Sequence, residues 1–235
     1  MTEIFNSYLY QPILAILIFI YKNFAFHDFG LAIIIFTLLV RVIFFPIFYK
    51  GAKDQALMQY LQPQIRKIQK DYKNDKEKQA KELFALYQKH NFNPFSGFFL
   101  LVIQLPILIA IYQIFVKELN NSAFDNLYFL GLINLGERNL ILVVLTAFFQ
   151  YFLAKISLFS SKNFSQQQQE KEDSVYFSLS KDFNKITVLL GPVLTVIILV
   201  VLPSALALYW LVSTVFSIFQ QVFIINKKVN QYQAK

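Results

Sequence analysis

The sequence contains no cysteine and only two histidines among its 235 residues. Without cysteine, disulfide bonds, thiol catalysis and thiolate metal sites are excluded. His27 and His90 lie far apart in the chain, so we expect no metal site and no cofactor. Charged residues make up only 15% of the chain, less than a soluble domain of this size would carry.

The sequence also lacks the short motifs that mark several large enzyme classes. It has no G-x-x-x-x-G-K-[ST] phosphate loop, no H-E-x-x-H zinc motif and no G-x-S-x-G nucleophile motif. Its long apolar runs contain no aspartate or glutamate, so the paired carboxylates of an intramembrane aspartic protease are missing. We therefore expect no catalytic residues and no enzymatic activity.

Apolar residues are abundant instead, at 56% of the chain with 27 Phe and 13 Tyr, which indicates a membrane protein. A helix needs about 20 mostly apolar residues to cross a bilayer. Phe29–Tyr49, Phe98–Val116 and Leu140–Phe159 meet that length, and Ile186–Ile225 runs for 40 residues without a charge. This last run would be ~60 Å long as one helix, twice the ~30 Å hydrocarbon thickness, so it must fold back. Because proline ends a helix, we place the corner at Leu202–Ser204, which gives five spans.

A shorter apolar run, Ile13–Tyr21, precedes the first span. It is too short to cross the bilayer, and with Pro12 at its start we predict a helix lying on the membrane surface. The alternative is a sixth, marginal span. No basic region precedes the run and no small-residue cleavage site follows it, so a cleavable signal peptide is not expected.

Basic residues cluster in alternate loops. Eighteen of them lie in residues 50–93, 155–185 and the tail after Ile225, whereas the opposite loops hold only three. Such a bias marks the cytoplasmic side, so we predict an N-terminus outside and a C-terminus in the cytoplasm. The net charge of +8 would suggest nucleic-acid binding in a soluble protein. Here the positive-inside bias explains the charge, and no direct nucleic-acid function is expected.

Residues 50–93 form the longest polar segment and predict a helical hairpin. Apolar residues recur at helical spacing in each arm, at Leu57, Leu61, Ile65, Ile68 and Tyr72 and then at Ala80, Leu83, Phe84 and Tyr87. A polar turn at Lys73–Lys76 joins the arms, and Pro63 should kink the first of them. The fold class is therefore an all-α integral membrane protein with five transmembrane helices, an N-terminal interfacial helix and a cytoplasmic helical hairpin.

The predicted division of the chain runs from an outer N-terminal segment to a cytoplasmic tail. Its parts are 1–28 (outer segment with the interfacial helix), 29–49 (span 1), 50–93 (cytoplasmic hairpin), 94–116 (span 2), 117–139 (outer loop), 140–159 (span 3), 160–185 (cytoplasmic loop), 186–202 (span 4), 203–226 (span 5) and 227–235 (cytoplasmic tail).

Arg41 is the most informative single residue, because a charge within a span costs at least ~2.5–3.5 kcal/mol. Such a residue should face a polar cavity or a partner, and Thr37 lies one helical turn earlier on the same face. A salt bridge to an intramembrane carboxylate is one alternative, although the spans contain none. The other is an arginine that snorkels to the membrane surface, about 12 Å away by helix rise.

Several motifs, in order along nearly the whole chain, resemble the YidC/Oxa family of membrane insertases. They are Leu38–Pro46 (LLVRVIFFP), Met58–Ile65 (MQYLQPQI), Asp71–Lys76 (DYKNDK), Asn93-Pro94, Gln104–Ile107 (QLPI), Leu202–Leu206 (LPSAL), Leu208–Trp210 (LYW) and Gln220-Gln221. The chain resembles the short members, which carry no large outer domain before the first span. It differs from the members that hold ribosomes through a long basic tail, since its own tail is short, and it carries Ser204 where a small alanine is more usual.

This resemblance implies a helical groove that is open to the cytoplasm and to lipid and that receives the polar part of a substrate. Matched by motif, the groove would be lined by Arg41, Thr37, Gln104, Gln150 and Trp210. The implied partners are nascent membrane proteins and the lipid bilayer, with the ribosome or the Sec translocon beside them. The implied location is the plasma (inner) membrane of a bacterium.

Three other classes of function fit the sequence less well. A transporter or channel would need a continuous pore or inverted repeats, and neither a repeat nor an even span count is present. A passive scaffold gains nothing obvious from a charge inside a span. An intramembrane enzyme would need the catalytic motifs that the sequence lacks.

Overall fold

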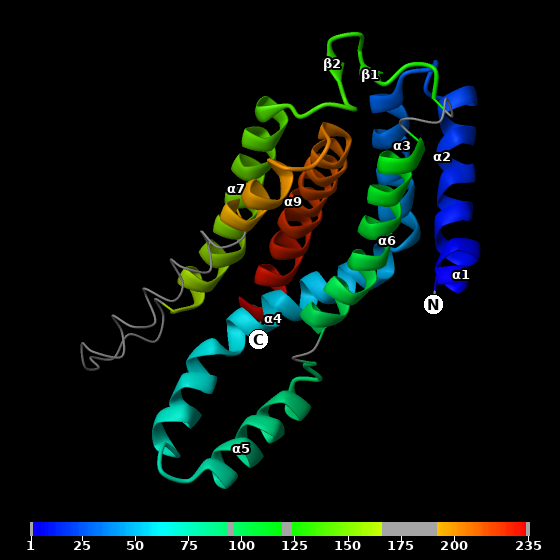
Figure 1. Ribbon diagram of the computed structural model, residues 1–235. Helices are drawn as coiled ribbons and strands as arrows, with labels where there is room; N and C mark the ends of the chain where they lie inside the picture. The colour runs from blue at the N-terminus through cyan, green and yellow to red at the C-terminus, as the bar shows by residue number, and fades with distance from the viewer. Residues whose placement is uncertain (1, 94–95, 119–123, 166–191, 234–235) are drawn as a thin grey trace.

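A computed structural model of the chain describes residues 2–93, 96–118, 124–165 and 192–233. Within these ranges the protein is almost entirely helical, as the sequence predicts (Figure 1). The elements are α1 (Thr2–Phe5), the short π-helical η1 (Asn6–Tyr10), α2 (Gln11–Asn23), α3 (Phe29–Ile43), α4 (Phe45–Asp71), α5 (Lys76–Lys89), α6 (Ser96–Glu118), β1 (Tyr128–Phe129), β2 (Ile133–Asn134), α7 (Leu140–Ser165), a helix at 192–199, and α9 (Ser204–Gln233). The two strands form a small antiparallel hairpin that the sequence did not predict.

One apolar core joins α2, α3, α6, α7 and α9. Among its fully buried members are Phe29, Ile33, Phe115 and Leu206. Large apolar side chains also cover the outer faces, for example Phe148 on α7 and Phe219 on α9, which are 59% and 71% exposed. Water would penalise such broad apolar exposure, whereas lipid chains cover it without cost.

The predicted count of five spans is not established by these helices. By length and composition, two helices of the described residues could cross a membrane, Glu3–Asn23 and Ser204–Phe223. The bent pair formed by α3 and the start of α4 raises this number to three. Most of the predicted 160–185 loop and the first part of span 4 lie outside the described residues, so five spans remain a prediction.

The predicted first span, 29–49, is not one continuous helix in the structure, and whether the bent pair forms one span stays a prediction. Asp28 caps the start of α3 by accepting a hydrogen bond from the Leu31 amide at 2.8 Å, but α3 ends at Ile43. The chain bends there by 68° before α4 begins at Phe45. The reason is Pro46, which has no amide hydrogen and whose ring clashes with the carbonyl four residues earlier.

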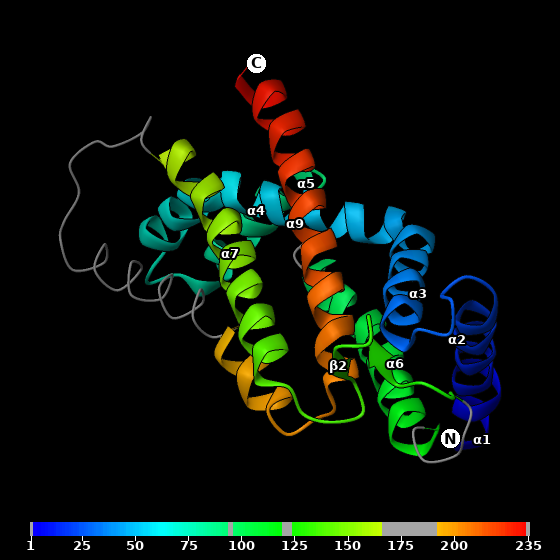
Figure 2. The ribbon, with the colours of Figure 1, turned by 90° about the horizontal axis from the view of Figure 1, so that it is seen from above.

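After this bend, α4 runs across one end of the bundle, where it contacts α6, α7 and α9 (Figures 1 and 2). Its far half and α5 form the hairpin predicted for residues 50–93. Leu57, Leu61 and Ile65 of α4 are buried in a small cluster of their own, separate from the bundle core. On α5 the seam differs from the prediction, because Phe84 is 62% exposed and Leu86 is buried in its place. Pro63 lies inside α4 without ending it.

The N-terminal helix is longer than predicted, since helical residues run from 2 to 23 rather than only through Ile13–Tyr21. Two buried tyrosines attach it to the region where α6 ends. The Tyr10 hydroxyl donates to Glu118 Oε1 at 2.6 Å, and the Tyr21 hydroxyl accepts from the Asn126 amide at 2.9 Å. These tyrosines are about 17 Å apart along the helix. The residues that bind the two tyrosines, Glu118 and Asn126, lie at the end of α6 and shortly after it. This geometry favours a helix that lies across that end of the bundle.

The predicted corner at Leu202–Ser204 is confirmed, because the helix at 192–199 ends before it and α9 begins at Ser204. The structure also explains Ser204. Its backbone amide donates to the Glu137 carbonyl at 2.9 Å, and its hydroxyl donates to the same oxygen. The Ala205 amide donates to the Leu135 carbonyl at 3.0 Å. The start of α9 is thereby fixed to the loop that follows α6.

Candidate functional site

Arg41 lies in the last turn of α3 and is half-buried. Its Nε donates to the Ser213 hydroxyl of α9 at 2.9 Å, and its Nη2 donates to the same oxygen. The guanidinium also lies over the Phe48 ring of α4, 4.5 Å from the ring centre. Thus three helices meet at this cation, and the guanidinium contacts α9 and α4.

The charge of Arg41 has no counter-charge within the described part of the chain. Its partners there, a hydroxyl and an aromatic ring, are both neutral. A cation–π contact contributes about 0.5–2 kcal/mol, depending on how dry the site is. The carboxylate salt bridge considered from the sequence is therefore not what holds Arg41 in place.

A second polar pair lies one turn earlier on α9. Gln104 of α6 donates from Nε2 to the Tyr209 hydroxyl at 2.7 Å, and Tyr209 is only 2% exposed. Tyr209 and Ser213 are four residues apart and so occupy the same face of α9. This face therefore brings Arg41 and Gln104 together, although they come from different helices.

Gln150 of α7 belongs to the neighbouring face of α9. Its Nε2 donates to the Thr214 hydroxyl at 3.2 Å, and the Thr214 hydroxyl donates to the Trp210 carbonyl at 2.8 Å. Thr146, one turn before Gln150, donates to the Ala207 carbonyl at 3.2 Å. These bonds join α7 to α9, which is the ordinary role of polar residues between membrane helices.

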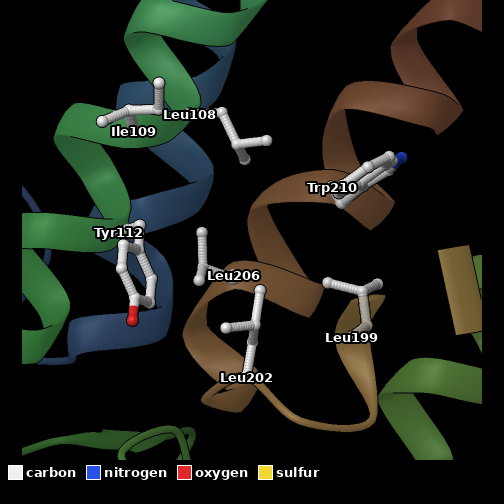
Figure 3. A pocket seen from close by; sticks show the side chains of 7 residues that line it. All are labelled: Leu108, Ile109, Tyr112, Leu199, Leu202, Leu206 and Trp210. Atoms are coloured by element: carbon white, nitrogen blue, oxygen red, sulfur yellow. The ribbon is translucent and has the colours of Figure 1, made fainter. Parts of the chain in front are cut away.

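Thr37 and Trp210 are placed differently from the other predicted groove residues. Thr37 is 1% exposed, and its hydroxyl donates to the Ile33 carbonyl of its own helix at 2.6 Å. Trp210 faces an apolar cavity between α6, the 192–202 segment and α9 (Figure 3). The other residues that line this cavity are Leu108, Ile109, Tyr112, Leu199, Leu202 and Leu206. The indole therefore offers apolar surface there.

Sequence reasoning did not identify Tyr209 as a partner within the polar site, and it gave Ser213 no particular role. The sequence contained one indication of their role, because Tyr209 and Ser213 are four residues apart on the helix that also carries Trp210. That spacing shows a shared face, but it does not show which other helix the face meets. Within the described residues, no group of three His, Asp or Glu side chains could hold a metal ion.

The chain matches the family model described as 60Kd inner membrane protein over residues 19–231. It is 31% identical over 223 residues to the membrane protein insertase YidC of Wolinella succinogenes, which covers 94% of this chain and 37% of that protein. It is 31% identical to the YidC of Oceanobacillus iheyensis, with 85% of this chain and 75% of that protein covered. For the YidC of Clostridium perfringens the identity is 34%, over 83% of this chain and 77% of the relative.

Proposed function

The chain belongs to the 60Kd inner membrane protein family, whose curated relatives are named membrane protein insertase YidC, and on this premise we propose that it inserts other proteins into the lipid bilayer. The chain spans only 37% of the length of the Wolinella relative. The activity of that whole protein is therefore assigned to this chain only as part of the proposal. The substrates are nascent membrane proteins. The ribosome and the Sec translocon are the partners from which such chains would arrive.

The observation that carries the proposal is the charge of Arg41, which has no counter-charge among the described residues and lies against Ser213, on the face of α9 whose Tyr209 binds Gln104 of α6. An isolated charge in a membrane segment costs a few kcal/mol unless water or a partner solvates it. We infer that Arg41, Thr37, Gln104, Gln150 and Trp210 line a groove open to the cytoplasm and to lipid. Arg41 and Gln104 supply its polar side, and Trp210 supplies apolar surface.

The work done by this site is physical rather than chemical. The apolar segment of a substrate gains free energy on entering lipid, at roughly 0.8 kcal/mol for each buried CH₂ group. Its polar flank must cross, and each charge at mid-membrane costs about 2.5–3.5 kcal/mol. A wet groove that reaches part of the way shortens the dry path, and Arg41 attracts acidic flanks. The membrane potential can add ~2.3 kcal/mol for each elementary charge that moves across a potential of 100 mV.

The proposal places the protein in the bacterial plasma membrane with its N-terminus outside. The helix at residues 2–23, the 124–139 segment and the start of α9 are bonded to one another at one end of the bundle. The hairpin of α4 and α5 lies towards the other end (Figure 1). Because the hairpin is rich in lysine, it is the cytoplasmic end by the positive-inside bias.

Cysteine labelling tests this orientation, because the natural chain has no thiol of its own. We expect Lys73→Cys, at the tip of the hairpin, to react with a membrane-impermeant maleimide only when the cytoplasmic side is open. Leu132→Cys, at a position 82% exposed near the β-hairpin, should react in intact cells. The reverse pattern would refute the orientation.

Complementation tests the proposed function itself. In bacteria depleted of their own insertase, expression of this chain should restore insertion of short, single-span proteins. Protease protection of a tagged outer flank measures that insertion directly. If the chain reaches the membrane at normal abundance and no substrate inserts, the proposed function is wrong.

A further inference from the structure

The polar face of α9 extends well beyond the turn that holds Arg41. Ser213 meets Arg41, and Ser217 follows four residues later, where its hydroxyl donates to the Ser213 carbonyl at 2.9 Å. Gln220 lies seven residues after Ser213, two turns further along the same face. Gln221 lies seven residues after Thr214, the partner of Gln150. The glutamine pair is thus about 10 Å from Ser213 along the helix axis.

Both glutamines are buried, yet neither side-chain nitrogen has a partner among residues 2–93, 96–118, 124–165 and 192–233. Gln220 is 7% exposed and Gln221 is 3% exposed, and the Nε2 atoms of both lack a hydrogen-bond acceptor. The opposite face of the same turn is apolar and open, with Phe219 71% exposed and Phe223 59% exposed. A buried donor without an acceptor is destabilising, and native structures rarely retain one without a reason. Two of them on one helical turn point to an acceptor that the described part of the chain does not supply.

We propose that Gln220 and Gln221 form an entry subsite whose side-chain amides donate hydrogen bonds to backbone carbonyls of a substrate's polar flank. This inference rests on the proposed function and adds the chemical group that is recognised there. An amide NH₂ group is a neutral donor with two hydrogens, which suits carbonyl oxygens and is indifferent to the substrate's side chains. An extended chain rises about 3.3 Å for each residue, so three to four residues reach from the pair to the level of Arg41.

This placement separates two tasks along α9. The glutamines receive the backbone of any extended flank, and Arg41 then favours flanks that carry negative charge. α4 contacts α9 across this end of the bundle (Figure 2). The proposed subsite therefore requires α4 to move away from α9 before a flank can reach the buried amides. The glutamines are therefore positioning residues for the flank and need no contact with the apolar segment.

The test uses the full chain in proteoliposomes and two synthetic substrates that share one apolar segment. One substrate carries a flank of uncharged polar residues, so Arg41 does not discriminate it by charge, and the other has the flank removed. In the variant Gln220→Met with Gln221→Met, which keeps shape but removes both donors, translocation of the flank should fall about three- to tenfold. Insertion of the flankless substrate should stay within twofold of the unsubstituted chain, and the Tm in detergent should not fall. The matched control is Phe219→Leu on the lipid-facing side of the same turn, which should leave both substrates unaffected.

Two results would overturn the inference. An equal loss for both substrates means that the glutamines only support the fold, and no loss for either means that they do not contact the flank. A failure of the unsubstituted chain to insert the flankless substrate above empty vesicles is a different result, because it contradicts the proposed function itself and the inference with it.

Contact with the flank can also be detected directly. Ser217→Cys, on the polar face, should form a disulfide with a single cysteine placed in the substrate flank, and the yield should fall severalfold when the two glutamines are replaced by methionine. Phe219→Cys should not capture the flank. Capture at position 219 in place of 217 would show that the flank travels along the lipid-facing side, which contradicts the subsite.

Discussion

Replacement of Arg41 by alanine should reduce the insertion of substrates with acidic flanks by about ten- to a hundredfold, which corresponds to the loss of roughly 1.4–2.8 kcal/mol of attraction. The protein itself should remain abundant and embedded, since removal of a charge from α3 lowers the cost of its own insertion by about 2.5 kcal/mol. Arg41→Lys should retain much activity, although lysine loses the planar fork that contacts Ser213. The measurement is protease protection of the substrate flank, scored beside membrane abundance.

The structure supplies a control that separates charge from helix packing. Ser213→Ala removes the hydroxyl that accepts from Arg41 but leaves the cation in place. If the role of Arg41 is to hold α3 against α9, both variants should lower the Tm in detergent, and insertion should fall together with abundance. If its charge acts on the substrate, only Arg41→Ala should impair insertion strongly. Full insertion by Arg41→Ala at normal abundance would refute the role in the groove.

The largest loss of stability is expected from Tyr21→Ala in the N-terminal helix. Tyr21 is fully buried, and its ring packs edge-on against Phe124 with the ring centres 5.2 Å apart. Its hydroxyl accepts from the Asn126 amide at 2.9 Å and donates to the Asn126 carbonyl at 3.4 Å. Truncation of a buried aromatic side chain costs about 3–5 kcal/mol. The Tm of the purified protein should fall, and amide hydrogen exchange should accelerate throughout residues 2–23.

Tyr21→Phe is the matched control for this prediction, because it keeps the ring and removes only the hydroxyl. It should cost about 1 kcal/mol, the usual net value of one hydrogen bond. An unchanged Tm in Tyr21→Ala would mean that the N-terminal helix is not part of the bundle. A loss in Tyr21→Phe as large as in Tyr21→Ala would mean that the hydrogen bond to Asn126, rather than packing, holds the helix.

The helices were predictable from the sequence where a long apolar run coincides with one helix. The predicted runs at 98–116 and 140–159 lie within α6 and α7, and the corner at Pro203 follows from proline chemistry. Pro46 has the same chemistry, but it lies inside an apolar run long enough to be read as one span. The bend between α3 and α4 was therefore missed. The N-terminal helix was predicted too short because only its apolar part was counted.

Tertiary partners were much harder to predict than helices. Arg41 and Gln104 could be selected because polar residues are costly in apolar surroundings. Their partners on α9 depend on how that helix is rotated against α3 and α6, which local periodicity does not specify. The α5 seam shows the same limit, since Phe84 and Leu86 lie close in sequence and only packing against α4 decides which of them is buried.

In the proposed mechanism the protein itself moves a polar flank across the bilayer and releases an apolar segment into lipid, whichever partner delivers the substrate. The most direct test is insertion of a purified single-span substrate with an acidic flank into proteoliposomes that contain only this protein, without nucleotide. We expect the flank to become protected from added protease well above the level in empty vesicles, and Arg41→Ala to bring protection close to that level. Protection equal to that in empty vesicles with the unsubstituted chain, correctly folded and oriented, would contradict the account.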